Sequence, residues 1–127
     1  MVGMCLNLDS VSLSKYRLHL YMPATDMRKG YAGLTALSYG IGIDLRAGKD
    51  LVIFRSRNGK SIKMLAYDER GLVLITRRLR DGCFAKIQAI AGDPDRVLTA
   101  SMVLSYFADG KAEDNETFSH LLARESS

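Results

Sequence analysis

The dipeptide Asn58-Gly59 constrains the fold of this 127-residue chain more than any other feature. It stands between two runs rich in β-branched, aliphatic and aromatic residues, at positions 51–57 and 60–67. Asn-Gly favours a two-residue type I′ turn, in which both central residues have positive φ. Such a turn fixes the register of a hairpin. The expected pairs are Arg57 with Lys60, Arg55 with Ile62, Phe54 with Lys63, Ile53 with Met64 and Leu51 with Ala66.

A second turn signal, from Asp68 to Gly71, extends this hairpin into a meander of three antiparallel strands. The aliphatic run at residues 72–80 follows that turn, and the register then pairs Ile62 with Arg77. Residues 16–22 alternate between apolar and polar positions, which predicts a strand near the N-terminus. Residues 83–90 offer one further strand after a turn at Asp81-Gly82.

One helix is predicted before the meander in the chain, and a second is predicted after it. The first buries a stripe of residues that recur every three or four positions, with Thr25 or Asp26 as its cap. Its members are Met27, Tyr31, Leu34, Leu37 or Ser38, and Ile41. The second helix begins after Asp93-Pro94 and ends at Gly110, with Thr99 as an alternative cap for a shorter helix.

These elements predict a single α+β domain over residues 1–110. It consists of an antiparallel β-meander with an N-terminal strand, one helix packed on the sheet and a C-terminal helix. Residues 111–127 are acidic and carry no strong apolar face, so they are expected to form a flexible C-terminal tail.

Composition is that of a soluble globular protein, with 47% hydrophobic and 25% charged residues. No apolar run approaches the ~18 residues that span a bilayer, so no membrane partner is expected. The first fourteen residues carry no Lys or Arg, which is unlike a secretory signal. Two cysteines without CxxC spacing fit a reducing compartment, and we expect the protein in the cytoplasm.

Charge is distributed unevenly along the chain, although the net charge is only +4. Residues 15–86 contain fifteen basic and six acidic residues, whereas residues 93–127 contain three basic and seven acidic ones. A basic body of this kind indicates an anionic partner, nucleic acid first among them. A well-solvated surface without a partner explains the same composition.

The predicted register gathers basic side chains at one end of the sheet. Arg55, Arg57 and Lys60 fall on one face, and Arg77 joins them. Lys63 and Arg78 fall on the other face, with Arg80 beyond them. A basic β-ribbon of this size fits the major groove of DNA and neutralises phosphates. Charges on strand ends also discourage pairing with a second sheet, which is the alternative explanation.

A second basic pair, Arg28 and Lys29, is placed in the first turn of the predicted helix. Two cations there oppose the helix dipole unless an anion compensates them, and helix N-termini bind phosphate. Alternatively, Asp26 caps the helix and pairs with Arg28 or Lys29.

Four motifs in one order resemble the small accessory protein, often called TnpB, of bacterial insertion sequences of the family numbered sixty-six. They are PATDMRKG at 23–30, FRSRNGKSIK at 54–63, YDERG at 67–71 and RLRDGCF at 78–84. The resemblance implies an accessory role in transposition beside a separately encoded transposase. This family is unrelated to the RNA-guided nuclease of the same name. The family's tryptophan-rich stretch is missing, because residues 72–76 are aliphatic and the chain has no tryptophan.

The leading hypothesis is therefore a non-catalytic accessory factor in transposition that binds transposon DNA through the basic sheet end. The alternative is a protein-interaction module that docks on the transposase, and an inactive copy is a third possibility. The predicted nucleic-acid-binding residues are Arg28, Lys29, Arg55, Arg57, Lys60, Lys63, Arg77, Arg78 and Arg80.

No catalytic residue, metal site or cofactor is predicted. Zinc needs three or four converging ligands, and the two histidines and two cysteines do not have that spacing. Asp26, Asp44, Asp50 and Asp68 do not form a recognisable acidic triad. The glycines match neither a phosphate-binding loop nor a dinucleotide fingerprint. The sequence therefore indicates binding rather than catalysis.

Overall fold

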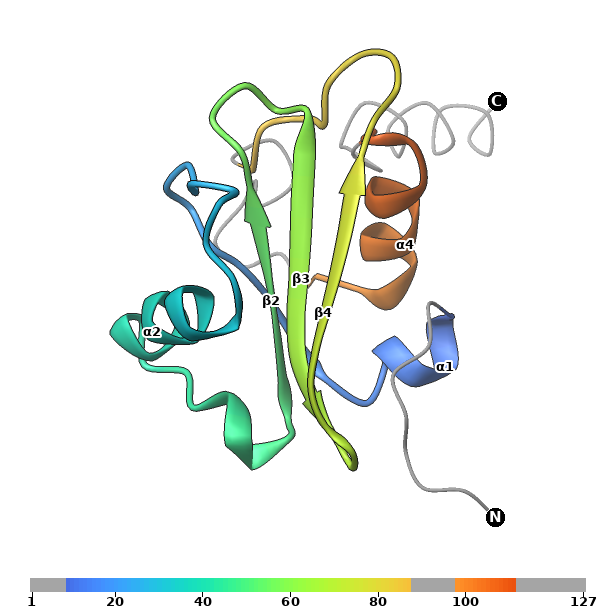
Figure 1. The fold of residues 1–127 in the computed structure, drawn as a ribbon. Helices are drawn as coiled ribbons and strands as arrows, with labels where there is room; N and C mark the ends of the chain where they lie inside the picture. Colours follow the sequence, from blue (N-terminus) through green and yellow to red (C-terminus); the bar gives the residue numbers. More distant parts are fainter. Residues whose placement is uncertain (1–8, 88–97, 112–127) are drawn as a thin grey trace.

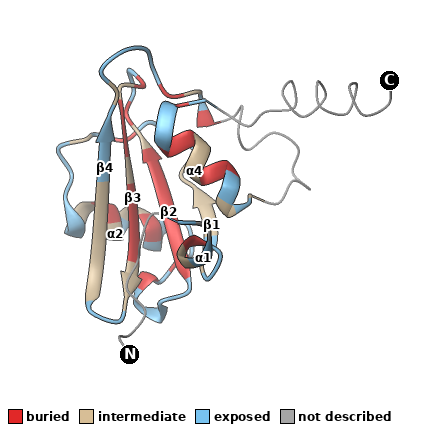
Figure 2. Cartoon of the chain, turned by 90° about the vertical axis from the view of Figure 1, so that its right-hand side faces the viewer, coloured by how far each residue is buried: buried red, intermediate tan, exposed pale blue. Residues whose placement is uncertain are grey.

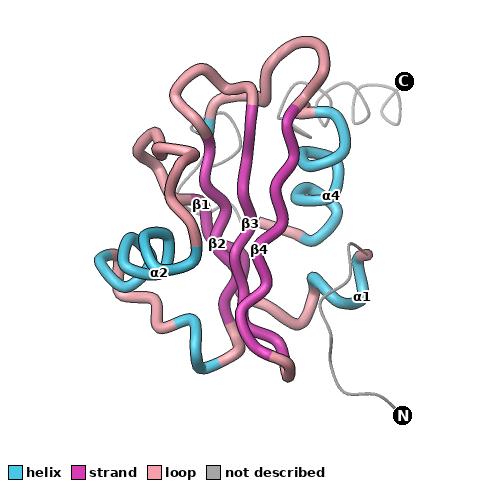
Figure 3. The backbone as a smooth tube through the Cα atoms, in the orientation of Figure 1, coloured by secondary structure: helices cyan, strands magenta, loops and turns pink. Residues whose placement is uncertain are grey.

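The computed structural model describes residues 9–87 and 98–111, which form a four-stranded sheet with helices on both faces (Figures 1 and 3). The predicted α+β class is confirmed. In chain order the elements are α1 (Ser10–Leu13), β1 (Arg17–Leu20), α2 (Tyr31–Gly40), the 3-10 helix η1 (Leu45–Ala47), β2 (Asp50–Arg55), β3 (Ser61–Asp68), β4 (Gly71–Arg78) and α4 (Ala100–Asp109). Within the described residues, no helix is both long and apolar enough to cross a membrane.

The sheet has the order β1-β2-β3-β4. β2, β3 and β4 form the predicted antiparallel meander, and its register is confirmed, with Arg55 opposite Ile62 and Ile62 opposite Arg77. The prediction of an antiparallel sheet is incomplete, because β1 pairs with β2 in parallel. Parallel neighbours need a crossover, which the chain makes through α2 and η1.

The loop between β2 and β3 reaches the predicted register by a different turn. Gly59 has φ +74°, as a type I′ turn requires. Only glycines have positive φ in the described chain, so Asn58 does not, and the prediction of a type I′ turn was wrong. Asn58 Oδ1 instead accepts hydrogen bonds from Lys60 N and Ser56 Oγ, both at 2.9 Å. A Cβ atom on Gly59 would collide with the guanidinium of Arg55. The turn therefore needs glycine for its φ, and a side chain at this position would displace the guanidinium of Arg55. Arg57 and Lys60 lie in the loop rather than opposite each other in the ladder.

The sheet buries side chains on both faces, and most residues of β2 and β3 are buried (Figure 2). One face, which we call the α4 face, packs against α1 and α4; it carries Leu51, Ile53, Ile62, Met64 and Ala66. The opposite face, the α2 face, carries Val52, Phe54 and Leu65, which pack against Leu34, Ile43 and Leu45. Because β2 is covered on both sides, its middle residues, 51–54, form a continuous apolar run rather than an alternating one.

The first long helix begins later than predicted. α2 starts at Tyr31 with Gly30 as its N-cap, so Arg28 and Lys29 precede the helix. Asp26 ends the extended chain instead, because its carboxylate accepts the N–H of Arg28 at 2.9 Å and its carbonyl accepts that of Lys29 at 3.1 Å. Tyr31 and Ile41, placed on the buried stripe by their spacing, are exposed, whereas Leu34 and Ser38 are buried.

The second long helix has the shorter of its two predicted forms. Thr99 caps α4 by accepting the N–H of Met102 at 3.2 Å, and Gly110 ends it with φ +79°. The predicted cap at Asp93-Pro94 lies outside the described residues, as do residues 112–127 of the tail predicted at 111–127.

Residues 83–87 do not form the predicted further strand, and residues 88–90 lie outside the described chain. Phe84 N donates to Gly59 O at 2.7 Å, and Ala85 N donates to Gly110 O at 2.6 Å. The segment therefore connects the β2–β3 loop to the end of α4. α1 was not predicted; its Leu13 is buried against the core.

Candidate nucleic-acid interface

The nine predicted binding residues lie near one end of the sheet, where β2 and β4 finish and β3 begins. We call this the loop end; it is uppermost in Figure 1. Seven of the residues lie on β2, β3, β4 or the loops that follow them. Arg28 and Lys29 are brought to the same end because Lys63 Nζ donates to Met27 O and Lys29 O, both at 2.9 Å. The structure thus brings the predicted set to one end of the sheet. It does not place Arg57 on the face of Arg55 and Arg77 as predicted, because Arg57 lines a hollow together with Arg78.

Three of these cations hold the loop end together on the α4 face. Arg55 donates from Nε and Nη2 to Phe84 O, at 3.2 and 2.9 Å, and from Nη1 to Ser56 O. The guanidinium of Arg77 lies 4.7 Å from the ring centre of Phe107, in a cation–π contact. Lys60 Nζ donates to Gly82 O at 3.3 Å.

Tyr106 of α4 packs beside Arg55 at the same place. Its hydroxyl donates to Ala85 O at 2.6 Å, and its ring meets that of Phe84 edge-on at 5.3 Å. Burial raises the pKa of Tyr106 to about 12, against the opposing effect of the positive charge on Arg55. The tyrosine therefore stays protonated and acts as a hydrogen-bond donor at neutral pH.

Arg28 is already paired, as one of the two explanations from sequence proposed. Its Nη2 lies 2.7 Å from Asp26 Oδ2, and the hydrogen bonds from Arg28 hold the pKa of Asp26 well below its usual range. The other explanation, a phosphate site in the first helical turn, placed Arg28 in α2 and was wrong about that position.

Most of the gathered cations have no carboxylate partner in the described chain, and three of them, Arg55, Lys60 and Lys63, donate to backbone carbonyls. Within the described residues, only Arg28 and Arg80 of the nine have a carboxylate partner. The Arg80–Asp81 contact, at 3.9 Å between fully exposed side chains, is weak. A carbonyl oxygen satisfies a donor but does not cancel its charge. The loop end therefore keeps a concentrated positive charge.

A shallow hollow of about 390 Å³ opens on the α2 face of the loop end. It is lined by Thr25, Met27, Ser56, Arg57, Asn58, Ser61 and Arg78. Four of these residues form a row across adjacent segments: Thr25 bridges to Ser56, Ser56 N donates to Ser61 O, and Ser61 lies opposite Arg78. Paired residues on neighbouring strands point to the same face, so the row presents three hydroxyls and one guanidinium together.

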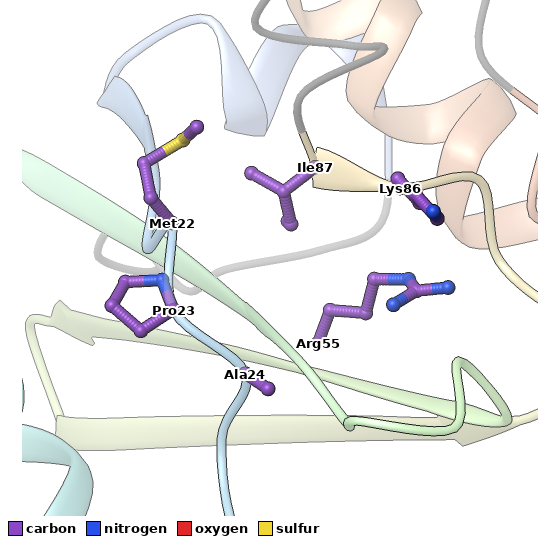
Figure 4. A pocket seen from close by; sticks show the side chains of 6 residues that line it. All are labelled: Met22, Pro23, Ala24, Arg55, Lys86 and Ile87. Atoms are coloured by element: carbon purple, nitrogen blue, oxygen red, sulfur yellow. The ribbon is translucent and has the colours of Figure 1, made fainter.

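A smaller hollow of about 240 Å³ opens on the α4 face (Figure 4). Met22, Pro23, Ala24 and Ile87 make its apolar walls, and Arg55 and Lys86 lie on one side of it in that view. Lys86 is exposed and was not among the predicted residues.

The other polar cluster lies at the far end of β1 and β2. The buried carboxylate of Asp50 accepts hydrogen bonds from Arg17 Nε at 2.9 Å and from His19 Nε2 at 2.7 Å. Burial alone would raise the pKa of Asp50, but these hydrogen bonds outweigh it and leave the pKa below its usual value. In the described parts of the chain, no three His, Cys, Asp or Glu side chains come together where they could hold a metal ion.

Comparison with known proteins identifies one related family. The family model described as IS66 Orf2 like protein matches residues 16–114. No curated protein and no solved structure matches the chain. The matched span includes the whole sheet, α4 and all nine predicted binding residues.

Proposed function

The chain belongs to the IS66 Orf2-like family, and from this premise we propose that it serves insertion-sequence transposition as a non-catalytic accessory factor that binds DNA. The observation that carries the proposal is the loop end, where seven gathered cations have no carboxylate partner in the described chain. A surface of this kind attracts a polyanion, because each phosphate contact releases counterions into solution.

Arg57 and Arg78 are the side chains best placed for this contact. Both are exposed, and neither makes a hydrogen bond or ion pair within the described residues. Arg55, Lys60 and Lys63 add to the local potential while their donors hold backbone carbonyls. Contacts of this type fix a protein on the phosphate backbone but read no sequence.

The test is a binding titration of the full chain with two duplexes of equal length at several salt concentrations. One duplex carries the end of the insertion sequence and the other is unrelated. We expect Arg57→Ala/Arg78→Ala to weaken binding to both duplexes. The salt dependence should become shallower by about one unit for each phosphate that the variant no longer neutralises.

A matched control is the double variant Arg46→Ala/Arg70→Ala, which removes the same charge at the opposite end of the sheet. Arg46 lies on η1 and Arg70 lies in the β3–β4 turn, and both are exposed. Binding by this variant should stay close to that of the parent. Equal weakening by the two variants would mean that net charge alone drives binding, and a parent that binds no DNA at low salt would refute the proposal.

One observation favours a second candidate, docking on the transposase. Tyr31, Tyr39 and Ile41 of the α2 region expose 48%, 70% and 49% of their surface. Exposed aromatic residues are enriched where proteins bind each other. Retention of the chain by purified transposase without DNA, and its loss in Tyr31→Ser/Tyr39→Ser, would support this candidate.

A further inference from the structure

Thr25 carries a buried hydroxyl that no group in the structure uses. The residue is only 4% exposed, and its Oγ1 has no hydrogen-bond partner. Its backbone N–H is engaged, because Thr25 N donates to Arg55 O at 2.9 Å. A buried polar atom without a partner costs free energy, so a group that supplies a partner would be stabilised there.

The neighbouring side chains show where that partner would come from. Thr25 lines the hollow on the α2 face, and its bridge to Ser56 places both side chains on that face. Ser56 Oγ is committed, since it donates to Asn58 Oδ1 at 2.9 Å and accepts the N–H of Ser61 at 3.1 Å. The Thr25 hydroxyl is therefore a buried donor without an acceptor, on a residue that lines the hollow.

The charge around the hollow fits an anion. Arg57 and Arg78 both line it, and none of the described residues that line it is acidic. A guanidinium presents paired N–H donors that match the oxygens of a phosphate group. The hollow, at about 390 Å³, has room for such a group.

We propose that this hollow is a phosphate subsite, held by Arg57 and Arg78 and completed by the hydroxyl of Thr25. The inference rests on the proposed function, under which the ligand is one phosphodiester of the DNA backbone. It goes beyond that function by naming where one phosphate sits and which uncharged side chain recognises it.

The test uses Thr25→Val, which removes the hydroxyl and keeps the shape of the side chain. The probes are inorganic phosphate, followed by NMR chemical shifts of the loop-end amides, and duplex DNA, followed by titration. We expect Thr25→Val to bind both probes roughly tenfold more weakly. Its melting temperature without ligand should equal or exceed that of the parent, because an unpaired buried hydroxyl is gone.

The chain offers a matched control in Thr35 of α2. Its Oγ1 is also buried without a partner, but Thr35 does not line the hollow. Thr35→Val should bind phosphate and DNA like the parent, whereas Arg78→Ala should lose the phosphate response.

The outcomes separate the subsite from the function. If Thr25→Val binds both probes like the parent, the subsite is refuted even when Arg57→Ala/Arg78→Ala still weakens DNA binding. If the parent binds phosphate at the hollow in a Thr25-dependent way but binds no duplex, the subsite stands and the DNA-binding function fails.

Discussion

Arg55 uses its charge inside the protein. Three of its nitrogens donate to two backbone carbonyls, and its guanidinium lies against Gly59 and beside Tyr106. Phe84 O has Arg55 as its donor, so removal of the guanidinium would leave a buried carbonyl unsatisfied. The main role of Arg55 is therefore to stabilise the fold through these hydrogen bonds.

We expect Arg55→Met to lower the free energy of unfolding by about 1.5–3 kcal/mol, the range for hydrogen bonds to charged groups. Arg57→Met, an equal change at an exposed position two residues away, should stay within about 0.5 kcal/mol of the parent. Urea denaturation followed by circular dichroism measures both. Equal stability of the two variants would show that the contact with Phe84 contributes nothing.

Asp50 predicts a response to acid. Its pKa in the folded protein lies below the ordinary 3.8, so the ionised carboxylate stabilises the fold above pH 3.8 and loses this effect as the pH falls through the folded value. Asp50→Asn should therefore be less stable than the parent at pH 7, and the stability difference should shrink as the pH falls below 3.8. A stability difference that is independent of pH would contradict this assignment.

The β2–β3 loop shows, at the level of elements, what local sequence determines. Two turn signals fixed the register of the meander and hence the faces of the cations on the strands. Arg57 is the exception, because it was predicted on the face of Arg55 and instead lines the hollow beside Arg78. The same register places Ser61 opposite Arg78, so part of the hollow was within reach of sequence analysis. The place of Thr25 beside the hollow could not be predicted in this way, because its bridge to Ser56 joins segments that are far apart in the sequence. The hydrogen bonds from Arg55 to Phe84 O could not be predicted from sequence for the same reason.

The cap of α4 gives the prediction for a single element. Thr99→Ala removes the side-chain acceptor of Met102 N and should cost about 1 kcal/mol of stability. Thr99→Ser keeps the acceptor and should remain close to the parent. Thermal unfolding of the three proteins distinguishes them, and an unchanged melting temperature in Thr99→Ala would argue against the cap.

For the whole molecule, we expect the acidic C-terminal segment to be dispensable for folding, because its sequence carries no strong apolar face. Among the described residues, α4 is capped by Gly110, before this segment begins. Deletion of residues 112–127 should change the melting temperature by no more than about 3 °C. A much larger fall would mean that Phe118, Leu121 or Leu122 packs on the core.

The parallel pairing of β1 affects how the chain is assembled during synthesis. Arg17 and its partner Asp50 are 33 positions apart, whereas β2, β3 and β4 pair through short turns. The meander is therefore the low-contact-order part of the molecule, and the first strand has to close a long loop to join it. During synthesis on the ribosome, β1 emerges well before β2 and stays without a pairing strand until β2 has been made. Its alternation of Arg17 and His19 with Leu18 and Leu20 keeps half of that waiting strand polar, which limits aggregation of the nascent chain.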